Sequence, residues 1–562
     1  MQKKKVLIGI MALILFALPF AHVNIGIDFA DVGYNLANYE NFPHIDKTWM
    51  ISTIGALLIG KGLTFLPFGH TMLGMNIYCT IIFAAVIIFF FVYFAKKYSI
   101  VPAFLGALIA ELISWCPYVI LYHYFSYFLF SMAAVLLARA LNRQNYKLTG
   151  LSAGLLAFNV FVKFPNILDI SLGAIILLYA FFKKENVRKH LITFIVTYIC
   201  TIAGGVLLID LLLGKNSYFE MIRGLSGISE NASSYSVFNM ISTILEGYRW
   251  DFIYFVILFA ASVCVLLITR KINSKKLIIC MSLGMCLVTL AVARVMRYYG
   301  RITFSYSEIF SYYPLAVVAI LLCMALFFFI LFNRNEDIEN RMLAAALIIV
   351  IIVTPIGSNN GLYTLINNTY AVFPFALCVL SAQIRKDSFM IPIASVAILW
   401  SVMLAFQGFI FHLDYVFNEE GALGAKYQIV QSNERLRFMK TSENKRKAIE
   451  EASDYFEKNE MIGNDAIIFG RIPMASYAFE LNNAISHIWP LLPSYPGDSF
   501  EHELKELSGT PAVVYCSDLG DLINDGYPNG TKEEMLSEYL NNNGYMEVFR
   551  NSVFVICMPN NR

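Results

Sequence analysis

The sequence predicts a mainly α-helical, polytopic membrane protein with a small α/β domain at its C-terminal end. Apolar residues make up 58% of the 562 residues and charged residues only 15%, whereas soluble proteins carry about 25% charged residues. Charge also divides the chain, because residues 1–412 have a formal net charge of +12 and residues 413–562 have −10. The two parts are therefore expected to lie in different solvents, as a transmembrane domain and an extracytoplasmic domain.

Thirteen apolar runs in the first part predict transmembrane helices. A helix needs about 17–25 apolar residues to cross a bilayer core of roughly 30 Å. The basic start and first apolar run look like a signal peptide, but a weak cleavage pattern and twelve further runs favour an uncleaved helix. The runs lie near residues 5–23, 71–95, 100–117, 121–138, 148–163, 166–182, 190–213, 251–269, 276–293, 312–332, 342–356, 366–383 and 389–412.

Basic residues between the runs predict the orientation. Seven alternate loops carry 20 Lys and Arg residues in short segments, and the six opposite loops carry nine in longer segments. Short cytoplasmic loops are enriched in Lys and Arg. We therefore expect a multi-pass protein of the cell (plasma) membrane, with a cytoplasmic N-terminus and, after thirteen spans, an extracytoplasmic C-terminal domain.

One further apolar stretch is expected not to span. Residues 50–66 are interrupted by three glycines and Lys61. If they crossed the membrane, every later loop would invert and Lys96 and Lys97 would move outside, against the charge bias. The first outer loop, about residues 24–70, is therefore expected to hold helices that lie in the outer membrane interface.

Residues 413–562 predict a small α/β layer fold. The segment has neither a glycine-rich phosphate loop nor a nucleophile elbow, so we expect no chemistry there. Cys516 and Cys557 fall in this domain and could form a disulfide. Strands are expected at Ala466–Phe469, Ala512–Tyr515 and Val548–Ile556, the last with a break near Asn551. Helices are expected near 432–459, 473–480, 499–507 and 532–540.

Two aspartates directly after the first run are candidate catalytic groups. Asp28 and Asp31 are three residues apart, a spacing that puts both on one face of a helix. A carboxylate at a partly desolvated membrane surface can have a raised pKa and accept a proton from a hydroxyl. The alternative is that either aspartate caps the interfacial helix.

A second group consists of cations expected at the outer membrane face. Lys163 sits where the fifth run meets a proline turn, and Arg294, Arg297 and Arg301 follow the ninth run at spacings of three and four. Arginines on one face of a continuing helix would suit phosphate oxygens. The alternative is that they bind lipid headgroups without taking part in catalysis.

Three weaker candidates come from the same outer side. His123 lies in an aromatic belt, where a hydrogen-bonded interface residue is the simpler interpretation. Glu111 lies within the third run, and an acid inside a membrane is either functional or held by a structural partner. Asn359 and Asn360 belong to a Gly-Ser-Asn-Asn-Gly segment that suits a turn and could also contact sugar hydroxyls.

Other function classes find no support in the sequence. The ten cysteines form no CxxC pair or metal spacing, and no phosphate-binding loop indicates ATP-driven transport. The acidic C-terminal domain has no basic face for nucleic acid. A divalent metal is compatible with the sequence, but no site for it is evident.

This arrangement resembles the GT-C superfamily of membrane glycosyltransferases, and is similar to the protein mannosyltransferase and aminoarabinose transferase type. Members have a cytoplasmic N-terminus, many spans, a long first outer loop and often an outer C-terminal domain. Their first loop carries an acidic motif, commonly Asp-Glu or Asp-x-Asp, often followed by an aromatic residue. Asp31-Val32-Gly33-Tyr34 looks like that motif. Val32 departs from it where Asp-Glu members have Glu, unless Asp28 supplies the second carboxylate.

The resemblance implies inverting transfer of a sugar from a polyprenyl-phosphate donor to a lipid-linked, glycan or protein acceptor, for synthesis of the cell envelope. Asp31 maps onto the catalytic acidic position, and Asp28 is the second candidate. Tyr34 and His123, like Asn359 and Asn360, are candidate substrate contacts. The lipid-phosphate cations are nominated by topology and charge rather than by a matched motif. Membrane lipids are the other expected partners.

Three alternatives remain open. A flippase or polysaccharide exporter shares outer cations but gives no reason for paired aspartates after the first span. A polysaccharide polymerase or ligase typically uses Arg and His in large outer loops and lacks this C-terminal domain. An oligosaccharide transferase to protein would need a peptide-binding motif in the outer domain, and none is evident.

Overall fold

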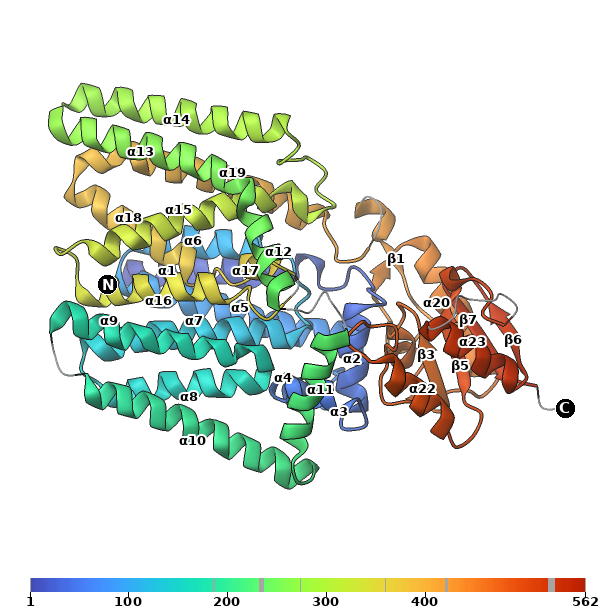
Figure 1. Ribbon diagram of the computed structural model, residues 1–562. Coiled ribbons are helices and arrows are strands. Elements are labelled where there is room, and N and C mark those ends of the chain that lie inside the picture. The colour runs from blue at the N-terminus through green and yellow to red at the C-terminus, as the bar shows by residue number, and fades with distance from the viewer. Residues whose placement is uncertain are drawn as a thin grey trace.

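The structure is a computed structural model that describes residues 2–184, 187–231, 237–272, 274–358, 360–419, 423–523 and 531–560. Long helices lie roughly side by side in a bundle, and the C-terminal domain packs against one end of it (Figure 1). The chain is mainly helical with a small C-terminal sheet domain, which confirms the predicted class.

Each of the thirteen apolar runs coincides with helical structure. In the described part of the chain, nine helices are long and apolar enough to cross a membrane. The other four runs form the shorter helices α6 (Ile100–Leu112), α8 (Tyr146–Val162), α16 (Ile338–Val353) and α18 (Val372–Lys386). The count of thirteen spans therefore stays a prediction.

The nine long helices form the greater part of the bundle. Three of them contain a 3-10 segment: one at its end and two at their start. They are α1 (Gln2–Ala17) with η1 (Leu18–His22), α5 (Met72–Lys97), α7 (Leu121–Asn142), η2 (Phe164–Gly173) with α9 (Ala174–Lys183), α10 (Arg188–Leu213), α13 (Asp251–Ile272), α14 (Lys275–Tyr298), α15 (Tyr313–Phe332), and η5 (Ser388–Met390) with α19 (Ile391–Asp414).

Short helices lie across the end of the bundle that faces the C-terminal domain (Figure 1). They are α2 (Asp31–Asn41), α3 (Lys47–Ser52), α4 (Ile54–Thr64), α11 (Ser217–Asn231), α12 (Val237–Arg249), η4 (Ile309–Ser311) and α17 (Tyr363–Ile366). The apolar residues 50–66, which are expected not to span the membrane, fall mainly in α3 and α4. At 1.5 Å per residue, the 11 residues of α4 extend about 16 Å, roughly half of a bilayer core.

The two ends of the bundle differ in what they carry. The N-terminus, the end of α9 with the start of α10, and the end of α13 with the start of α14 lie at the end away from the C-terminal domain (Figure 1). These are three of the places richest in Lys and Arg. These three basic segments and the acidic domain are therefore at opposite ends of the bundle.

The C-terminal domain is built on a five-stranded mixed sheet of order β4-β3-β5-β7-β6. Strand β3 pairs in parallel with β4 and β5, while β7 is antiparallel to β5 and β6. The strands are β3 (Asp465–Phe469), β4 (Asn482–Asn483), β5 (Ala512–Cys516), β6 (Tyr545–Arg550) and β7 (Phe554–Pro559). The helices are α20 (Glu443–Lys458), α21 (Met474–Ala478), α22 (Gly497–Glu506) and α23 (Lys532–Asn542), with short 3-10 turns η6 (Leu423–Lys426) and η7 (Ser517–Leu519).

Two details differ from the sequence prediction. The helix expected from residue 432 begins at Glu443, because β1 (Gln428–Ile429) and β2 (Lys440–Thr441) form a small antiparallel pair before it. Cys516 and Cys557 are both free thiols. In the β5–β7 register Cys516 faces Phe554 while Cys557 faces Val513, so the two cysteines are not cross-strand neighbours.

The domain is joined to the first outer loop by backbone hydrogen bonds. The Gly26 amide donates to the Lys440 carbonyl at 2.7 Å, and the Lys440 amide donates to the Asn24 carbonyl at 2.7 Å. The Met474 amide donates to the Phe29 carbonyl at 3.0 Å. One face of the sheet continues the hydrophobic core of the bundle, and the other face packs its own core under α22 and α23. The segment that leads into α2 is thus held between bundle and domain.

Candidate functional site

Asp28 caps the amino end of α2. Its Oδ1 accepts hydrogen bonds from the Ala30 amide at 2.9 Å and from Asn418 Nδ2 at 3.1 Å, and its Oδ2 accepts one from the Val32 amide at 2.7 Å. The side chain is buried, and burial raises its pKa although the three hydrogen bonds oppose the rise. These contacts match the capping alternative for Asp28.

Asp31, the first residue of α2, has different surroundings. Within the described residues, its carboxylate accepts no hydrogen bond and forms no ion pair, although the side chain is partly buried. Burial first, and the charge of Asp28 second, raise the pKa of Asp31 to about 6, while Arg471 opposes the rise. A carboxylate with this pKa is ionised at neutral pH and can still take a proton readily.

The charge of Asp31 acts on the walls of two cavities, although Asp31 itself lines neither. Asp31 interacts electrostatically with Cys116 and Tyr415, which line one cavity, and with Tyr122, which lines the other. We call the first the aromatic cavity and the second the lysine cavity. The Asp31 carboxylate is therefore close enough to both for its charge to act on their walls.

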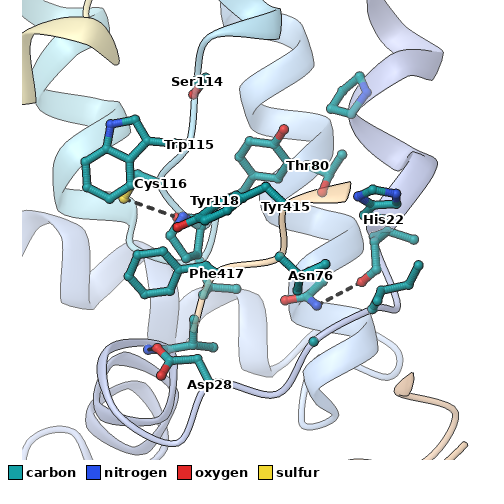
Figure 2. Close-up of a pocket in the computed structure, with 18 of the residues that line it drawn as sticks. His22, Asp28, Asn76, Thr80, Ser114, Trp115, Cys116, Tyr118, Tyr415 and Phe417 are labelled. Atoms are coloured by element: carbon teal, nitrogen blue, oxygen red, sulfur yellow. Dashed lines mark hydrogen bonds between the residues drawn. The ribbon is translucent and has the colours of Figure 1, made fainter. Parts of the chain in front are cut away.

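The aromatic cavity has a volume of about 130 Å³ and is shown in Figure 2. Its wall comes from the end of η1, the amino half of α5, the segment 114–119, the end of α19 and the segment 415–417. Asp28 contributes one side of it. Its rings are those of Trp115, Tyr118, Tyr415 and Phe417, together with Phe411, His22 and His412.

The lysine cavity has a volume of about 290 Å³. Lys163 lies in the turn between α8 and η2, and its Nζ is 5.8 Å from the centre of the Tyr122 ring. Asp46 also lines this cavity, and its Oδ2 caps α3 by accepting from the Trp49 amide at 2.7 Å. The cavity is thus lined by one lysine and one carboxylate, Lys163 and Asp46, together with aromatic and apolar side chains.

His487 brings the C-terminal domain into the same cavity. Its Nδ1 accepts from the Trp489 amide at 3.1 Å, which places the ring proton on Nε2, 3.3 Å from the Tyr34 hydroxyl. Burial lowers the pKa of His487 to about 3, so it is neutral. Tyr34 also packs on Trp49, whose ring is 5.6 Å from that of Tyr122. The C-terminal domain thus contributes His487 to the wall of the lysine cavity, and the expectation that it carries no chemistry stays a prediction.

The three arginines are not brought to either cavity. Arg301 pairs with the buried Asp251 at 3.1 Å, and Arg297 stacks on Phe304 with its guanidinium carbon 4.0 Å from the ring centre. Arg294 is exposed. Helix α14 ends at Tyr298, so the continuing helix that would align all three does not form. Of the four predicted cations, only Lys163 lines the lysine cavity, and none of the four lines the aromatic cavity.

The weaker candidates have mainly structural contacts. The Tyr127 hydroxyl lies 3.0 Å from His123 Nδ1, in agreement with a hydrogen-bonded interface residue. The Asn360 amide donates to Ser358 Oγ within a turn, and Asn359 lies outside the described residues. Glu111 is fully buried, and neither carboxyl oxygen has a hydrogen-bond partner among the described residues.

A divalent ion does not fit the described acidic groups at this site. Asp28 and Asp31 are not joined by a third carboxylate, histidine or cysteine, and no such group of three occurs elsewhere in the described ranges. Both carboxylate oxygens of Asp28 also accept hydrogen bonds from backbone amides in the cap of α2.

No protein-family model matches the sequence, and no curated protein matches it. Among solved structures, two of an Archaeoglobus fulgidus oligosaccharyltransferase are similar to this chain. The complex with zinc and sulfate has a TM-score of 0.48 and 12% identity, and the match covers 96% of this chain and 71% of that one. The apo form has a TM-score of 0.45 and 13% identity, over 92% and 70%. Likeness at this level assigns no activity, so the chemistry must come from the side chains at the amino end of α2.

Proposed function

We propose that this protein is a membrane glycosyltransferase of the GT-C type, which transfers a sugar from a polyprenyl-phosphate donor to a hydroxyl of an acceptor. One observation carries the proposal. The Asp31 carboxylate has no partner among the described residues and a pKa raised to about 6, and its charge acts on Tyr122, whose ring lies 5.8 Å from Lys163 Nζ in the lysine cavity. A base and a cation on the same aromatic side chain suit a transfer in which a hydroxyl loses a proton and a phosphate leaves.

The chemical step uses these two groups in opposite roles. The acceptor oxygen forms a bond to the anomeric carbon of the donor sugar as its proton passes to the Asp31 carboxylate. The bond from the anomeric carbon to the phosphate oxygen breaks on the opposite face, so the configuration inverts. Lys163 stabilises the charge that develops on the departing polyprenyl phosphate. The transferred group is a hexosyl or pentosyl unit.

The lysine cavity is the proposed site of the donor phosphate. Lys163 offers three N–H donors, and the wall beside it is aromatic and apolar, as a lipid-linked ligand requires. Arg294 and Arg297 lie on α14 and are assigned to lipid headgroups. Arg301 is assigned to its structural pair with Asp251.

The proposed setting is the outer face of the cell membrane, with residues 1–412 as the transmembrane domain and 413–562 outside. The separation of basic segments from the acidic domain at opposite ends of the bundle supports a cytoplasmic N-terminus. In this orientation Asp31 and Lys163 face the compartment in which cell-envelope glycans are built.

The test is donor binding and turnover by the purified full-length chain with a panel of polyprenyl-phosphate sugars. Lys163→Met should weaken donor binding by roughly 10- to 100-fold, because a charge-assisted contact is worth about 1.5–3 kcal/mol. Lys215→Met, at an exposed lysine after α10, is the matched control and should bind normally. The proposal fails if no donor in the panel is consumed, or if both variants bind as the wild type does.

A further inference from the structure

The aromatic cavity has the shape and chemistry of a site for a ring with polar edges. Trp115 and Phe417 stack with ring centres 6.1 Å apart, and Tyr118 and Tyr415 extend the wall from other segments (Figure 2). At about 130 Å³ the cavity accepts a compact group rather than an extended chain. Aromatic faces with a few placed polar groups are typical of sites for small polar rings.

The charge of this cavity distinguishes it from the lysine cavity. Its lining residues include no lysine or arginine. Polar groups on its wall are uncharged hydroxyl and amide side chains, apart from Asp28 and two histidines. A phosphate would find no lysine or arginine here, and an alkyl chain would leave the buried Thr80 hydroxyl without a partner. The lining therefore suits a neutral ligand with several hydroxyl groups.

The Thr80 side chain is separate evidence that the aromatic cavity binds a polar ligand. Its side chain is fully buried in α5 and points toward the cavity (Figure 2). Its hydroxyl has no hydrogen-bond partner among the described residues. Buried hydroxyl groups are almost always paired, because an unpaired one loses its bonds to water without replacement. A hydroxyl group of a ligand in the cavity would supply the missing partner.

We propose that the aromatic cavity binds a sugar ring of the acceptor, so that the acceptor is a glycan rather than a peptide. The inference rests on the proposed function and deepens it. The acceptor hydroxyl would reach the Asp31 carboxylate from the part of the cavity wall formed by Asp28 and Val32, which precede and follow Asp31 in the chain. The new glycosidic bond joins the acceptor oxygen to the donor's anomeric carbon, the proton goes to Asp31, and polyprenyl phosphate leaves.

Thr80→Val gives the sharpest test, because it replaces a hydroxyl by a methyl group of the same size. The Thr80 hydroxyl has no hydrogen bond within the described residues, so its removal should leave the thermal midpoint of unfolding unchanged or raise it. The affinity for glycan should fall about 3- to 10-fold, because the ligand loses its hydrogen bond to this hydroxyl. Thr289→Val is the matched control. The Thr289 hydroxyl is equally buried but donates to the Met285 carbonyl at 2.7 Å, so this variant should lose stability and keep its glycan affinity.

Binding is measured with the full-length chain in lipid nanodiscs, on an array that carries free oligosaccharides, glycolipids and serine- or threonine-rich peptides. Wild type should bind at least one glycan, free or lipid-linked, and Trp115→Ala should lower that affinity at least tenfold. The inference is overturned if only peptides are bound, if no glycan is bound, or if Thr80→Val binds glycan as wild type does. Polyprenyl-phosphate binding, which should depend on Lys163 and not on Thr80, is measured separately, so failure of the proposed function is seen independently.

Discussion

Asp28 and Asp31 lie three residues apart at the amino end of α2 but have different surroundings. Both carboxylate oxygens of Asp28 accept hydrogen bonds, whereas the Asp31 carboxylate accepts none from the described residues. Spacing alone predicted that both belong to one region. It did not separate their roles, because the partner that completes the Asp28 network, Asn418, is 390 residues away in the sequence. Likewise, no local pattern marks His487 or Arg471 as neighbours of the first loop.

The pH dependence of transfer follows from the pKa of Asp31. The carboxylate must be deprotonated to act as a base, and its pKa is raised to about 6 in the folded chain. We expect kcat/KM to fall about tenfold per pH unit below this value and to level off above it. Rate profiles between pH 4.5 and 8 with a saturating donor would check this. A profile that is flat down to pH 5 would contradict the role of Asp31.

At the scale of the element, periodicity and length predicted helices well and their ends less well. All thirteen apolar runs became helices because burial of an apolar face or contact with lipid favours a helix whatever its partners are. The strand predicted with a break near Asn551 is the hairpin of β6 and β7, whose turn includes that residue. The two-residue strands β1, β2 and β4 were missed, because they form by pairing rather than by their own composition.

Gly33 is required by the packing of α2 on α21. A Cβ atom at Gly33 would lie 2.5 Å from the Met474 backbone nitrogen, and that backbone cannot move easily because its amide donates to the Phe29 carbonyl. Gly33→Ala should therefore destabilise the protein by about 1–3 kcal/mol through overpacking. Thermal unfolding in detergent measures it.

Gly62→Ala in α4 is the matched control. A Cβ atom at Gly62 would meet nothing within 4 Å, so alanine should be neutral or stabilise the helix by up to about 1 kcal/mol. Equal effects at the two glycines would show that the close contact between α2 and α21 does not matter for stability.

At the scale of the whole molecule, the C-terminal domain acts as one wall of the candidate site. It joins the first outer loop through backbone bonds and through Arg435, which pairs with Glu40 and, at 2.9 Å, with Glu480. Composition predicted a separate domain, but a count of charges cannot predict which surfaces meet. For the same reason the charge pattern grouped the arginines near the end of α14 with Lys163. In the structure Lys163 lines the lysine cavity, whereas Arg301 pairs with Asp251 and Arg297 stacks on Phe304.

The orientation of the chain is tested by reporters. A tag after the last residue should report an extracytoplasmic location, and a tag between Lys183 and Lys189 should report the cytoplasm, because the basic segments lie at the end opposite the C-terminal domain. Protease accessibility in sealed vesicles gives the same information. A cytoplasmic C-terminal tag would place Asp31 and Lys163 on the wrong side for an extracytoplasmic donor.

The most direct test of the central claim is sugar transfer by Asp31→Asn, with Asp454→Asn at an exposed residue of α20 as the control. The folded chain raises the pKa of Asp31 to about 6, above its usual value of about 4, so the ionised carboxylate opposes folding. This loss of stability develops between those two pH values and is complete above the higher one. Asparagine should therefore stabilise the protein at pH 8 by about 1–3 kcal/mol, and the gain should vanish near pH 4.

Transfer by Asp31→Asn should nevertheless fall by roughly 10²–10⁴-fold, with donor binding intact. Burial raises the pKa of Asp28 too, but Asp28→Asn puts an NH2 group where a carboxylate oxygen accepts from a backbone amide in the cap of α2, so it should lower stability by about 1–2 kcal/mol. A stabilised but inactive Asp31→Asn is the predicted result. Wild-type turnover by Asp31→Asn would contradict the assignment of Asp31 as the base.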